Sequence, residues 1–294
     1  MKSKVALLTL IATLQASAAF AQFGYIDKSG KVVIPPKFEE AGRFKEDRAQ
    51  VKEAGKALFI DTTGKVALDP KTPLAESFCE GLAAVKQGDH WIYVDKAGKQ
   101  AIAKTFQRAF DFVDGLAMVQ EKDQYGYINK QGEWIIKPQF HSADGFSEGL
   151  AAVMIGEKFG FIDKTGKLVI KANLGEADAF HDGLARVMLF GSSNYAFIDK
   201  TGKVVLKPKG EEASDFSEGL SLVGSEKHWQ FIDKQGKPVF KANFDNAGSF
   251  SEGLAAAQKA GRWGYIDKNG NWVIKPQFKW ASEFSSGMAA VQVK

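Results

Sequence analysis

Short apolar runs recur along the chain in the same order and at a nearly constant spacing. The stretch WGYIDKNGNWVIKPQF (263–278) is almost repeated as YGYINKQGEWIIKPQF (125–140) and as FGYIDKSGKVVIPPKF (23–38). Aligned on a triplet of aromatic, aliphatic and Asp or Asn residues, the copies are marked by Tyr25, Phe59, Tyr93, Tyr127, Phe161, Phe197, Phe231 and Tyr265. The steps are 34 residues, except for one of 36 where FGSSNY (190–195) adds two. Such a fixed period indicates a repeat protein of eight units over residues 22–294.

Each unit contains three apolar runs of strand length that are bounded by turn residues. The first is GLAAV (149–153) and its variants, the second is WGYID (263–267), and the third is NWVI (271–274). The second and third are joined by D-K-x-G, whose glycine supplies the positive φ that a tight hairpin needs. Adjacent strand residues point to opposite faces. Because Tyr265 and Ile266 are both apolar, we expect both faces of the sheet to be covered.

A connector with the pattern A-x-x-F links each third strand to the next first strand. Its phenylalanines are Phe44, Phe78, Phe112, Phe146, Phe180, Phe216, Phe250 and Phe284. One Phe at the same place in every unit is typical of a shared hydrophobic core, so we interpret these side chains as core residues and not as a binding row. The sequence thus predicts an all-β protein of eight units, each with about 34 residues and three to four strands.

The order of strands at the two ends bears on how the units are assembled. We expect the mature protein to open with a second strand, FGYID (23–27), and to end with a first strand in MAAVQVK (288–294). Pairing of residues 24–27 with 288–293 would complete one sheet. We therefore favour a closed eight-bladed β-propeller, one domain over residues 22–294, over an open β-solenoid with polar end caps. The repeat is short for a propeller blade, and this favours the solenoid.

The pattern G-Y-I-D-K-x-G-x-x-V-I-x-P-x-F, followed by F-S-E-G-L-A-A-V, resembles the WG repeat, a family of bacterial β repeats. The family is named after a Trp-Gly pair. That pair stands at Trp263-Gly264, with aromatic-Gly counterparts at Phe23-Gly24, Tyr125-Gly126 and Phe159-Gly160. Four units depart from the pattern, for instance with Leu58 in place of the glycine and Ala242 in place of the proline. The resemblance covers essentially the whole mature chain, implies a repeat β protein and brings no catalytic residues with it.

The first 21 residues have the composition of a secretory signal peptide. Lys2 and Lys4 precede an apolar run, and Ala19-Phe20-Ala21 forms an A-x-A cleavage pattern that predicts Gln22 as the mature start. We therefore expect a periplasmic or secreted protein. The apolar run is too short to span a bilayer comfortably. No second run is long enough, so we expect no membrane span.

Charge and cysteine content narrow the range of partners. Without the two lysines of the signal peptide, 37 basic and 35 acidic residues remain. This balance argues against nucleic acid as a partner, because nucleic acid requires a concentrated basic surface. The single cysteine, Cys79, cannot form an internal disulfide, so packing must stabilise the fold. We expect a monomer whose partner is an unknown protein or a cell-envelope glycan.

Residues with catalytic or metal-binding chemistry are few and scattered. The histidines are His90, His141, His181 and His228. Their spacing does not suit a metal, and Cys79 has no histidine at a fixed spacing. In most of the D-K-x-G loops a Lys directly follows the Asp, and its positive charge would oppose the binding of calcium. The repeated acids Glu148, Glu218 and Glu252 lack the acidic partner of a glycosidase pair. We therefore predict no catalytic residue, no metal and no cofactor.

Residues that depart from a structural repeat are places where function can be added to it. Trp134 and Trp272 lie in third strands, and Trp280 lies in a connector. Exposed indoles suit sugars or peptide side chains, so these three are candidate ligand contacts, although we favour a role in covering sheet edges. The sequence predicts a non-enzymatic, extracytoplasmic binding or scaffold module. The alternatives are a lectin-like module that uses these tryptophans and, less favoured, a hydrolase at the mouth of the propeller. Such a hydrolase needs non-repeat carboxylates or histidines where the blades converge, and we expect none there.

N-terminal sequencing tests the signal-peptide prediction. Exported protein, expressed with its own first 21 residues, should begin at Gln22 because cleavage follows the A-x-A pattern. Retention of Met1 would contradict the cleavage and, with it, the extracytoplasmic location.

Overall fold

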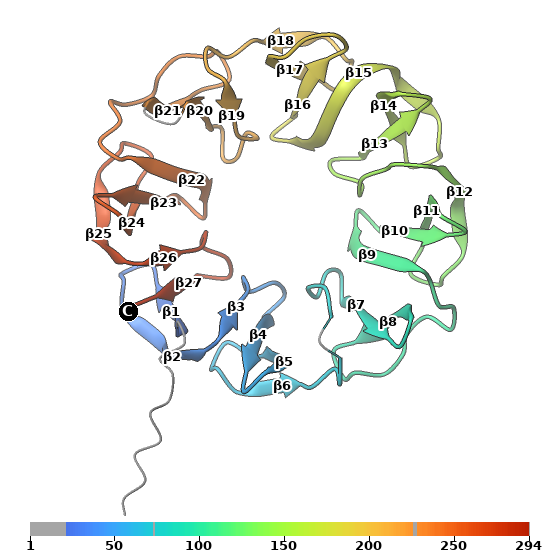
Figure 1. Cartoon of the computed structure of the whole chain (residues 1–294), viewed down its shortest axis with the longest axis horizontal. Helices are drawn as coiled ribbons and strands as arrows, with labels where there is room; N and C mark the ends of the chain where they lie inside the picture. The colour runs from blue at the N-terminus through green and yellow to red at the C-terminus, as the bar shows by residue number, and fades with distance from the viewer. Residues whose placement is uncertain (1–21, 73, 226–227, 294) are drawn as a thin grey trace, which may run out of the picture.

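The computed structural model describes residues 22–72, 74–225 and 228–293, and the predicted signal peptide lies outside these ranges. Every helix or strand in the described residues is a β-strand, which confirms the all-β prediction. The strands form sheets that stand side by side around a central opening, in a propeller-like arrangement (Figure 1). No helix that could cross a membrane is found in the described part of the chain.

The strands of the described residues fall into seven hydrogen-bonded sheets. Four sheets have four strands: β1 (Phe23–Asp27), β2 (Val32–Phe38), β26 (Trp280–Ala281) and β27 (Met288–Gln292); β3 (Glu40–Ala41), β4 (Ala49–Glu53), β5 (Lys56–Ile60) and β6 (Val66–Leu68); β9 (Arg108–Val113), β10 (Leu116–Glu121), β11 (Gln124–Ile128) and β12 (Trp134–Phe140); β22 (Asn246–Ser251), β23 (Leu254–Lys259), β24 (Arg262–Ile266) and β25 (Trp272–Phe278). The other three contain β7 (Leu82–Gln87) and β8 (His90–Asp95); β19 (Glu212–Ala213), β20 (Ser221–Ser225) and β21 (His228–Ile232); β13 (Leu150–Ile155), β14 (Lys158–Asp163), β15 (Leu168–His181), β16 (Leu184–Leu189), β17 (Tyr195–Asp199) and β18 (Val204–Leu206).

Each four-stranded sheet contains the three predicted strands and one more. In the sheet of order β12-β11-β10-β9, the strands β10, β11 and β12 are the predicted first, second and third strands. The A-x-x-F connector is itself a strand, β9, which pairs antiparallel with β10 through Phe112 opposite Ala117. It lies nearest the central opening, whereas the third strand lies at the outside of the ring (Figure 1).

The long strand β15 shows how one sheet leads to the next. Its first half pairs with β14, with Ile170 opposite Phe161. Its second half pairs with β16, with Phe180 opposite Ala185. One continuous strand is therefore the outermost strand beside β14 and the innermost strand beside β16. In the other units these two roles fall to separate segments.

Strands from the two ends of the described chain lie in one sheet, in the order β2-β1-β27-β26. β1 pairs antiparallel with β27, from Phe23 opposite Gln292 to Asp27 opposite Met288. This confirms the predicted pairing of residues 24–27 with the last strand of the chain. Figure 1 shows β1 and β27 side by side at the place where the blue and red ends of the chain meet.

Every unit contains one buried aromatic pair. The Tyr or Phe of the second strand meets the connector Phe 19 residues later, with ring centroids 4.7–4.9 Å apart. The pairs are Tyr25–Phe44, Phe59–Phe78, Tyr93–Phe112, Tyr127–Phe146, Phe161–Phe180, Phe197–Phe216, Phe231–Phe250 and Tyr265–Phe284. These rings are at most 2% exposed, and tilted or edge-on pairs of this kind add about 0.5–1.5 kcal/mol beyond burial. The prediction that the connector phenylalanines are core residues is confirmed.

Four of these pairs contain a tyrosine that also makes a hydrogen bond. The hydroxyls of Tyr25, Tyr93, Tyr127 and Tyr265 donate to backbone carbonyls of the innermost strands at 2.7–2.8 Å. Burial raises the pKa of all four hydroxyls well above the usual value, so they stay protonated and can donate. Each tyrosine thus ties a second strand to the wall of the central opening.

The glycine of the Trp-Gly pair is required by a bulge in the outer strand. In four units the outer strand has at least seven residues, and its register shifts, as between Phe23–Phe38 and Tyr25–Ile34. A Cβ on Gly24, Gly126, Gly160 or Gly264 would lie 2.3–2.6 Å from a carbonyl oxygen of the outer strand, which is too close. Units without this glycine have short outer strands, such as β6 beside Leu58. The aromatic-Gly pair, which is Trp-Gly only at residues 263–264, therefore marks the units with extended outer strands.

The outer part of each unit is here called the rim. It consists of the eight residues that follow the glycine of each D-K-x-G loop. These are residues 31–38, 65–72, 99–106, 133–140, 167–174, 203–210, 237–244 and 271–278. Pro36, Pro138 and Pro276 lie in the rim. Proline is tolerated in such outer strands because its missing N–H faces away from the sheet.

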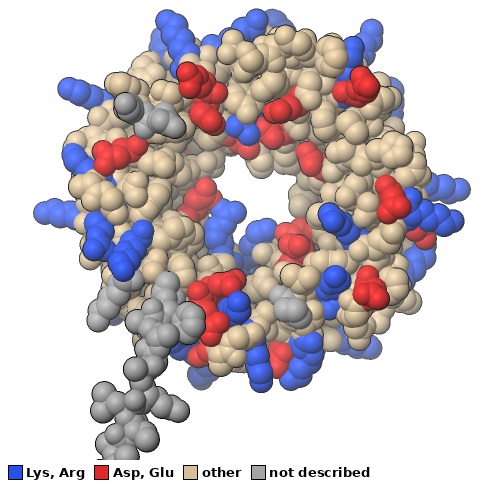
Figure 2. Space-filling model, in the orientation of Figure 1, with Lys and Arg blue, Asp and Glu red and all other residues tan. Residues whose placement is uncertain are grey.

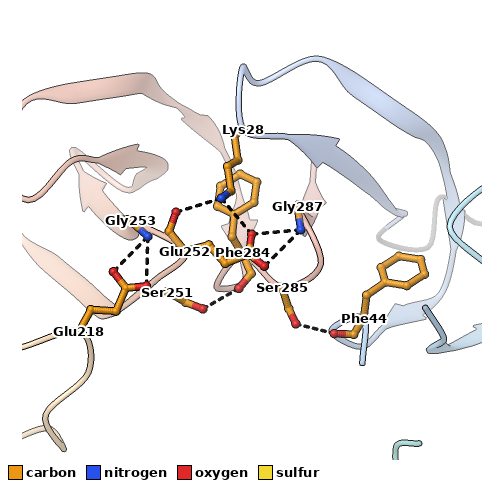
Figure 3. Close-up of polar contacts among 9 residues, drawn as sticks. All are labelled: Lys28, Phe44, Glu218, Ser251, Glu252, Gly253, Phe284, Ser285 and Gly287. Carbon is orange, nitrogen blue, oxygen red and sulfur yellow. Dashed lines mark hydrogen bonds and ion pairs between the residues drawn. The ribbon is translucent and has the colours of Figure 1, made fainter. Parts of the chain in front are cut away.

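A charged contact joins the inner turns of neighbouring units at seven junctions. An acid at the turn before each first strand accepts a hydrogen bond from the backbone N–H of the turn glycine in the next unit. At six of the seven, a lysine from a D-K-x-G loop also pairs with the acid. Glu252, for example, binds Gly287 N and lies 3.1 Å from Lys28 Nζ, which joins the two ends of the chain (Figure 3).

The eighth junction lacks all three partners of this contact. Ser286 stands in place of the acid, Asp47 in place of the glycine, and Thr62 in place of the lysine. The neighbouring Ser285 hydroxyl donates a hydrogen bond to the Phe44 carbonyl oxygen, so the inner turns are still joined (Figure 3). All three residues are replaced together, although Ser286 is far from Asp47 and Thr62 in sequence, which indicates that the contact acts as one unit.

Candidate functional site

The wall of the central opening is formed by the residues between the Ala and the Phe of each connector. Because the connector is the innermost strand, these positions lie closest to the centre of the ring (Figure 1). Six of the eight units have a carboxylate there: Glu76, Asp111, Asp144, Asp178, Asp215 and Glu283. Figure 2 shows acidic and basic side chains gathered around the opening. These positions differ from unit to unit, and we therefore take this channel wall as the candidate site.

One group of wall residues is centred on Asp111. Its Oδ2 atom lies 3.0 Å from Lys45 Nζ and 3.1 Å from Cys79 Sγ. Burial opposes the charge of Lys45, but Asp111 outweighs it and raises the pKa of this lysine. Burial and the hydrogen bond to Asp111 raise the pKa of Cys79 to about 12, so the thiol stays protonated. Burial and the charge of Asp111 also raise the pKa of Glu76.

A second group is centred on Arg186 of β16. Its Nε donates to Asp178 Oδ2 at 2.7 Å and lies 3.8 Å from Asp215 Oδ1. Burial and the charge of Asp178 raise the pKa of Asp215, although Arg186 opposes this. Asp144 is open to the water of the channel, yet the surrounding wall removes part of its hydration. This desolvation, with the charge of Asp178, raises the pKa of Asp144. One arginine is thus shared among several carboxylates.

The carboxylates on the wall correct the expectation that no non-repeat acids gather where the sheets converge. The signal was present in the sequence as the two variable residues of A-x-x-F. It was missed because the connector was interpreted as a link between strands and not as the innermost strand. Lys45 and Asp111 show the consequence, since they are 66 residues apart in sequence and form an ion pair.

The three tryptophans singled out from the sequence lie in three different sheets. Trp134 of β12 is partly buried and meets Phe106 edge-on, with centroids 6.4 Å apart. Trp272 of β25 is partly buried against another hydrophobic cluster. Trp280 of β26 is 40% exposed and meets Phe23 edge-on at 5.5 Å. The structure therefore does not bring them together, and Trp280 is the one with an open indole face.

The remaining candidate residues have little in common. All four histidines are exposed and lie in different units, which agrees with their interpretation as scattered surface residues. Within the described ranges, no group of three or more His, Cys, Asp or Glu residues is arranged to hold a metal ion. The protonated Cys79 is a poor nucleophile, because the thiolate is the reactive form.

A cleft of about 820 Å³ opens beside β21. Its lining includes His228, Trp229, Phe240 and Phe244. The unit concerned has Gln230 where others have the glycine of the Trp-Gly pair, and its outer segment pairs with β21 only through an isolated bridge. The missing outer strand therefore leaves these aromatic side chains partly open.

The family described as WG containing repeat matches the chain in eight consecutive segments. They are residues 23–56, 59–91, 93–125, 125–159, 159–189, 195–227, 229–263 and 263–294. The segments follow the units that the sequence pattern defines, including the gap at the two-residue insertion. No curated protein sequence matches the chain.

Several solved structures resemble the fold at low sequence identity. Apo AztD from Citrobacter koseri is 11% identical, with a TM-score of 0.51 over 93% of this chain and 98% of that chain. Hsv2p from Kluyveromyces lactis is 11% identical, with a TM-score of 0.50 over 79% of this chain and 93% of that chain. BamB from Moraxella catarrhalis is 10% identical, with a TM-score of 0.46 over 92% and 96%. At such identities the likeness concerns the fold alone.

Glu76 and Glu80 should respond to substitution with opposite signs. Because burial and Asp111 raise the pKa of Glu76, its charge destabilises the fold at neutral pH, and Glu76→Gln should raise the melting temperature. This gain should shrink as the pH falls through the raised pKa towards the ordinary value of the unfolded chain. Partial burial opposes the charge of Glu80, but bonds from Lys130 and Gly115 outweigh it and lower the pKa. Glu80→Gln should therefore lower the melting temperature at neutral pH, and this loss should fade on acidification.

Thermal melts of both variants and the parent between about pH 4 and pH 8 measure these effects. Each variant is the control for the other, since both remove one carboxylate from the same connector. Shifts of the same sign, or shifts that do not depend on pH, would contradict the assignment of strain to Glu76 and of stabilisation to Glu80.

Proposed function

Because the chain belongs to the WG repeat family, we propose that it is a closed eight-bladed β-propeller that acts as a non-enzymatic, extracytoplasmic binding or scaffold module. The location rests on the signal-peptide pattern that ends at Ala21. The binding role rests on the channel wall. There the residues that differ among the units carry charge, whereas the repeated residues form the buried frame.

Strand pairing supports the number of blades and their closure. Each blade takes the connector and first strand of one unit and the second and third strands of the next, so β15 serves two blades. The short sheets β7-β8 and β19-β20-β21 gain an outer segment through the bridges Trp91–Phe106 and Ile232–Pro238. The pairing of β1 with β27 supports a blade built from both ends of the chain.

Deletion of residues 287–294 tests closure, because it removes β27 and with it the pairing of β1. In a closed ring the deletion exposes a strand edge and uncovers two neighbouring blades, so the protein should lose cooperative melting and self-associate. An open solenoid would lose only a terminal strand and keep most neighbour contacts. The measurement is a thermal melt with light scattering, with deletion of residues 293–294 as the control that keeps β27. A monomeric truncated protein that melts within about two degrees of the parent would exclude closure.

Unsatisfied groups on the wall support a partner that docks there. The Oδ1 atoms of Asp111 and Asp215 are sheltered from solvent and have no hydrogen-bond partner among the described residues. Buried polar atoms are normally paired, and those left unpaired in a native structure often belong to a functional site. The two side chains as a whole are 22% and 36% exposed, so rotation of the carboxylates towards a docked protein partner would bring these oxygens to its hydrogen-bond donors.

Two other functions have a specific observation in their favour. The exposed indole of Trp280 suits the face of a sugar, which favours the lectin-like alternative. The carboxylates of raised pKa on the wall are groups that a hydrolase could use. A glycan array with the parent and Trp280→Ala tests the first alternative, which requires glycan binding by the parent that the variant loses. Hydrolysis of envelope glycans that is lost in Asp215→Asn would support the second.

Site-specific photocrosslinking in intact cells tests the proposed binding surface. A crosslinking amino acid at position 76 or 178, on the wall, should give a discrete adduct of higher mass, because a docked partner lies within its reach. The same amino acid at position 157, in the turn between β13 and β14, is the matched control and should give none. Absence of an adduct from both wall positions, or the same adduct from all three positions, would contradict docking at the wall.

A further inference from the structure

Lysines are concentrated on the rim of the ring. The rim contains fifteen lysines and two acidic residues, Asp69 and Glu133. All fifteen lysines are exposed, and Figure 2 shows basic side chains that project from the outer edge around the ring. Two of these lysines form ion pairs with described residues, Lys37 with Glu53 and Lys71 with Asp69. The rim therefore carries a largely uncompensated positive charge.

The rest of the molecule has the opposite charge. Residues 22–294 contain 37 basic and 35 acidic residues, so that 22 basic and 33 acidic residues remain outside the rim. The net charge of the protein is therefore nearly zero, although a positively charged rim surrounds a negatively charged remainder. Charges of one sign on one surface attract partners of the other sign and steer their approach.

Protection of sheet edges explains only part of this arrangement. Charged residues and prolines on an outer strand prevent other strands from pairing with it. Such protection uses lysine above other charged residues, and it also uses prolines, bulges and short strands, which this rim already has. Six of the eight rim segments nevertheless carry two or three lysines. The charge of the rim is almost entirely positive. Edge protection does not require this uniform sign, whereas the binding of an anion does.

The shape of the rim indicates what kind of anion fits it. The lysines are spread over all eight rim segments and thus around the whole ring. A flat membrane could touch only part of such a rim, whereas a flexible chain can follow its circumference. Single-stranded nucleic acid binds through aromatic side chains on which the bases stack. The exposed apolar residues of the rim are aliphatic, such as Val33, Val169 and Val205.

We propose that the rim binds a linear acidic polysaccharide, whose carboxylate or sulfate groups pair with the rim lysines along the circumference. This site is separate from the channel wall of the proposed function, and its test does not depend on that function. Because the contacts are ionic, binding releases counterions from the polymer and should weaken steeply with salt.

Titration calorimetry with alginate, a linear polyuronate, tests the proposal. The parent protein should bind at low salt, and log Kd should rise linearly with log salt. Lys203→Gln/Lys207→Gln/Lys209→Gln removes three charges from the most basic rim segment and should weaken binding about tenfold and reduce the salt slope. The matched control, Lys56→Gln/Lys122→Gln/Lys259→Gln, removes three charges in or next to turns between first and second strands and should leave Kd unchanged.

Further measurements keep the outcome decisive. The triple Lys→Arg variant of residues 203, 207 and 209 should bind as the parent does, which separates lost charge from lost folding. Equal weakening by the rim and control variants would overturn the proposal, as would no binding at low salt. Tighter binding of single-stranded DNA or of vesicles with anionic lipids than of alginate would overturn the assignment to a polysaccharide.

Discussion

The aromatic pair between the second strand and the connector is the contact on which the ring depends. It recurs in all eight units at 4.7–4.9 Å. Except for Phe161 and Phe180, whose strands β14 and β15 lie in one six-stranded sheet, it links the second strand of one sheet to the connector of the next, such as β24 with Tyr265 to the connector that holds Phe284. Because the same contact sets each step from sheet to sheet, it fixes one repeated angle between them. The tyrosine hydrogen bonds and the charged turn contacts also join neighbouring repeats. They therefore reinforce the geometry that the aromatic pairs define.

The repeat period was sufficient to predict the units, their strands and their core. The connector was harder, because Ala247 and Phe250 are three residues apart and both are buried. A regular strand places residues three apart on opposite faces. A bulge in β22 resolves this conflict, since Ala247 lies opposite Ala257 and Phe250 lies opposite Ala255. A pattern that a bulge has shifted does not alternate, and the sequence therefore did not identify the connector as the fourth strand.

The candidate site depends on contacts that no local pattern contains. Lys45 and Asp111 meet because successive connectors come to the centre of one ring, and nothing in the residues around either one indicates the other. Trp134 and Trp272 show the converse, since both stood out in the sequence and both are partly buried against a core. Departure from a repeat therefore identified unusual residues, but only the position of the strand in the ring could separate packing residues from wall residues.

The radial separation of charge follows from this same order of strands. The two residues between the Ala and the Phe of the innermost strand lie near the opening, and the outermost strand has an unpaired edge. Both places can vary without disturbing the aromatic pairs. Carboxylates collect on the first and lysines on the second. Two surfaces of opposite sign, separated by a buried frame, can hold different partners at once without competing. The repeat supplies that separation at every blade, which a single binding loop on an irregular fold would not.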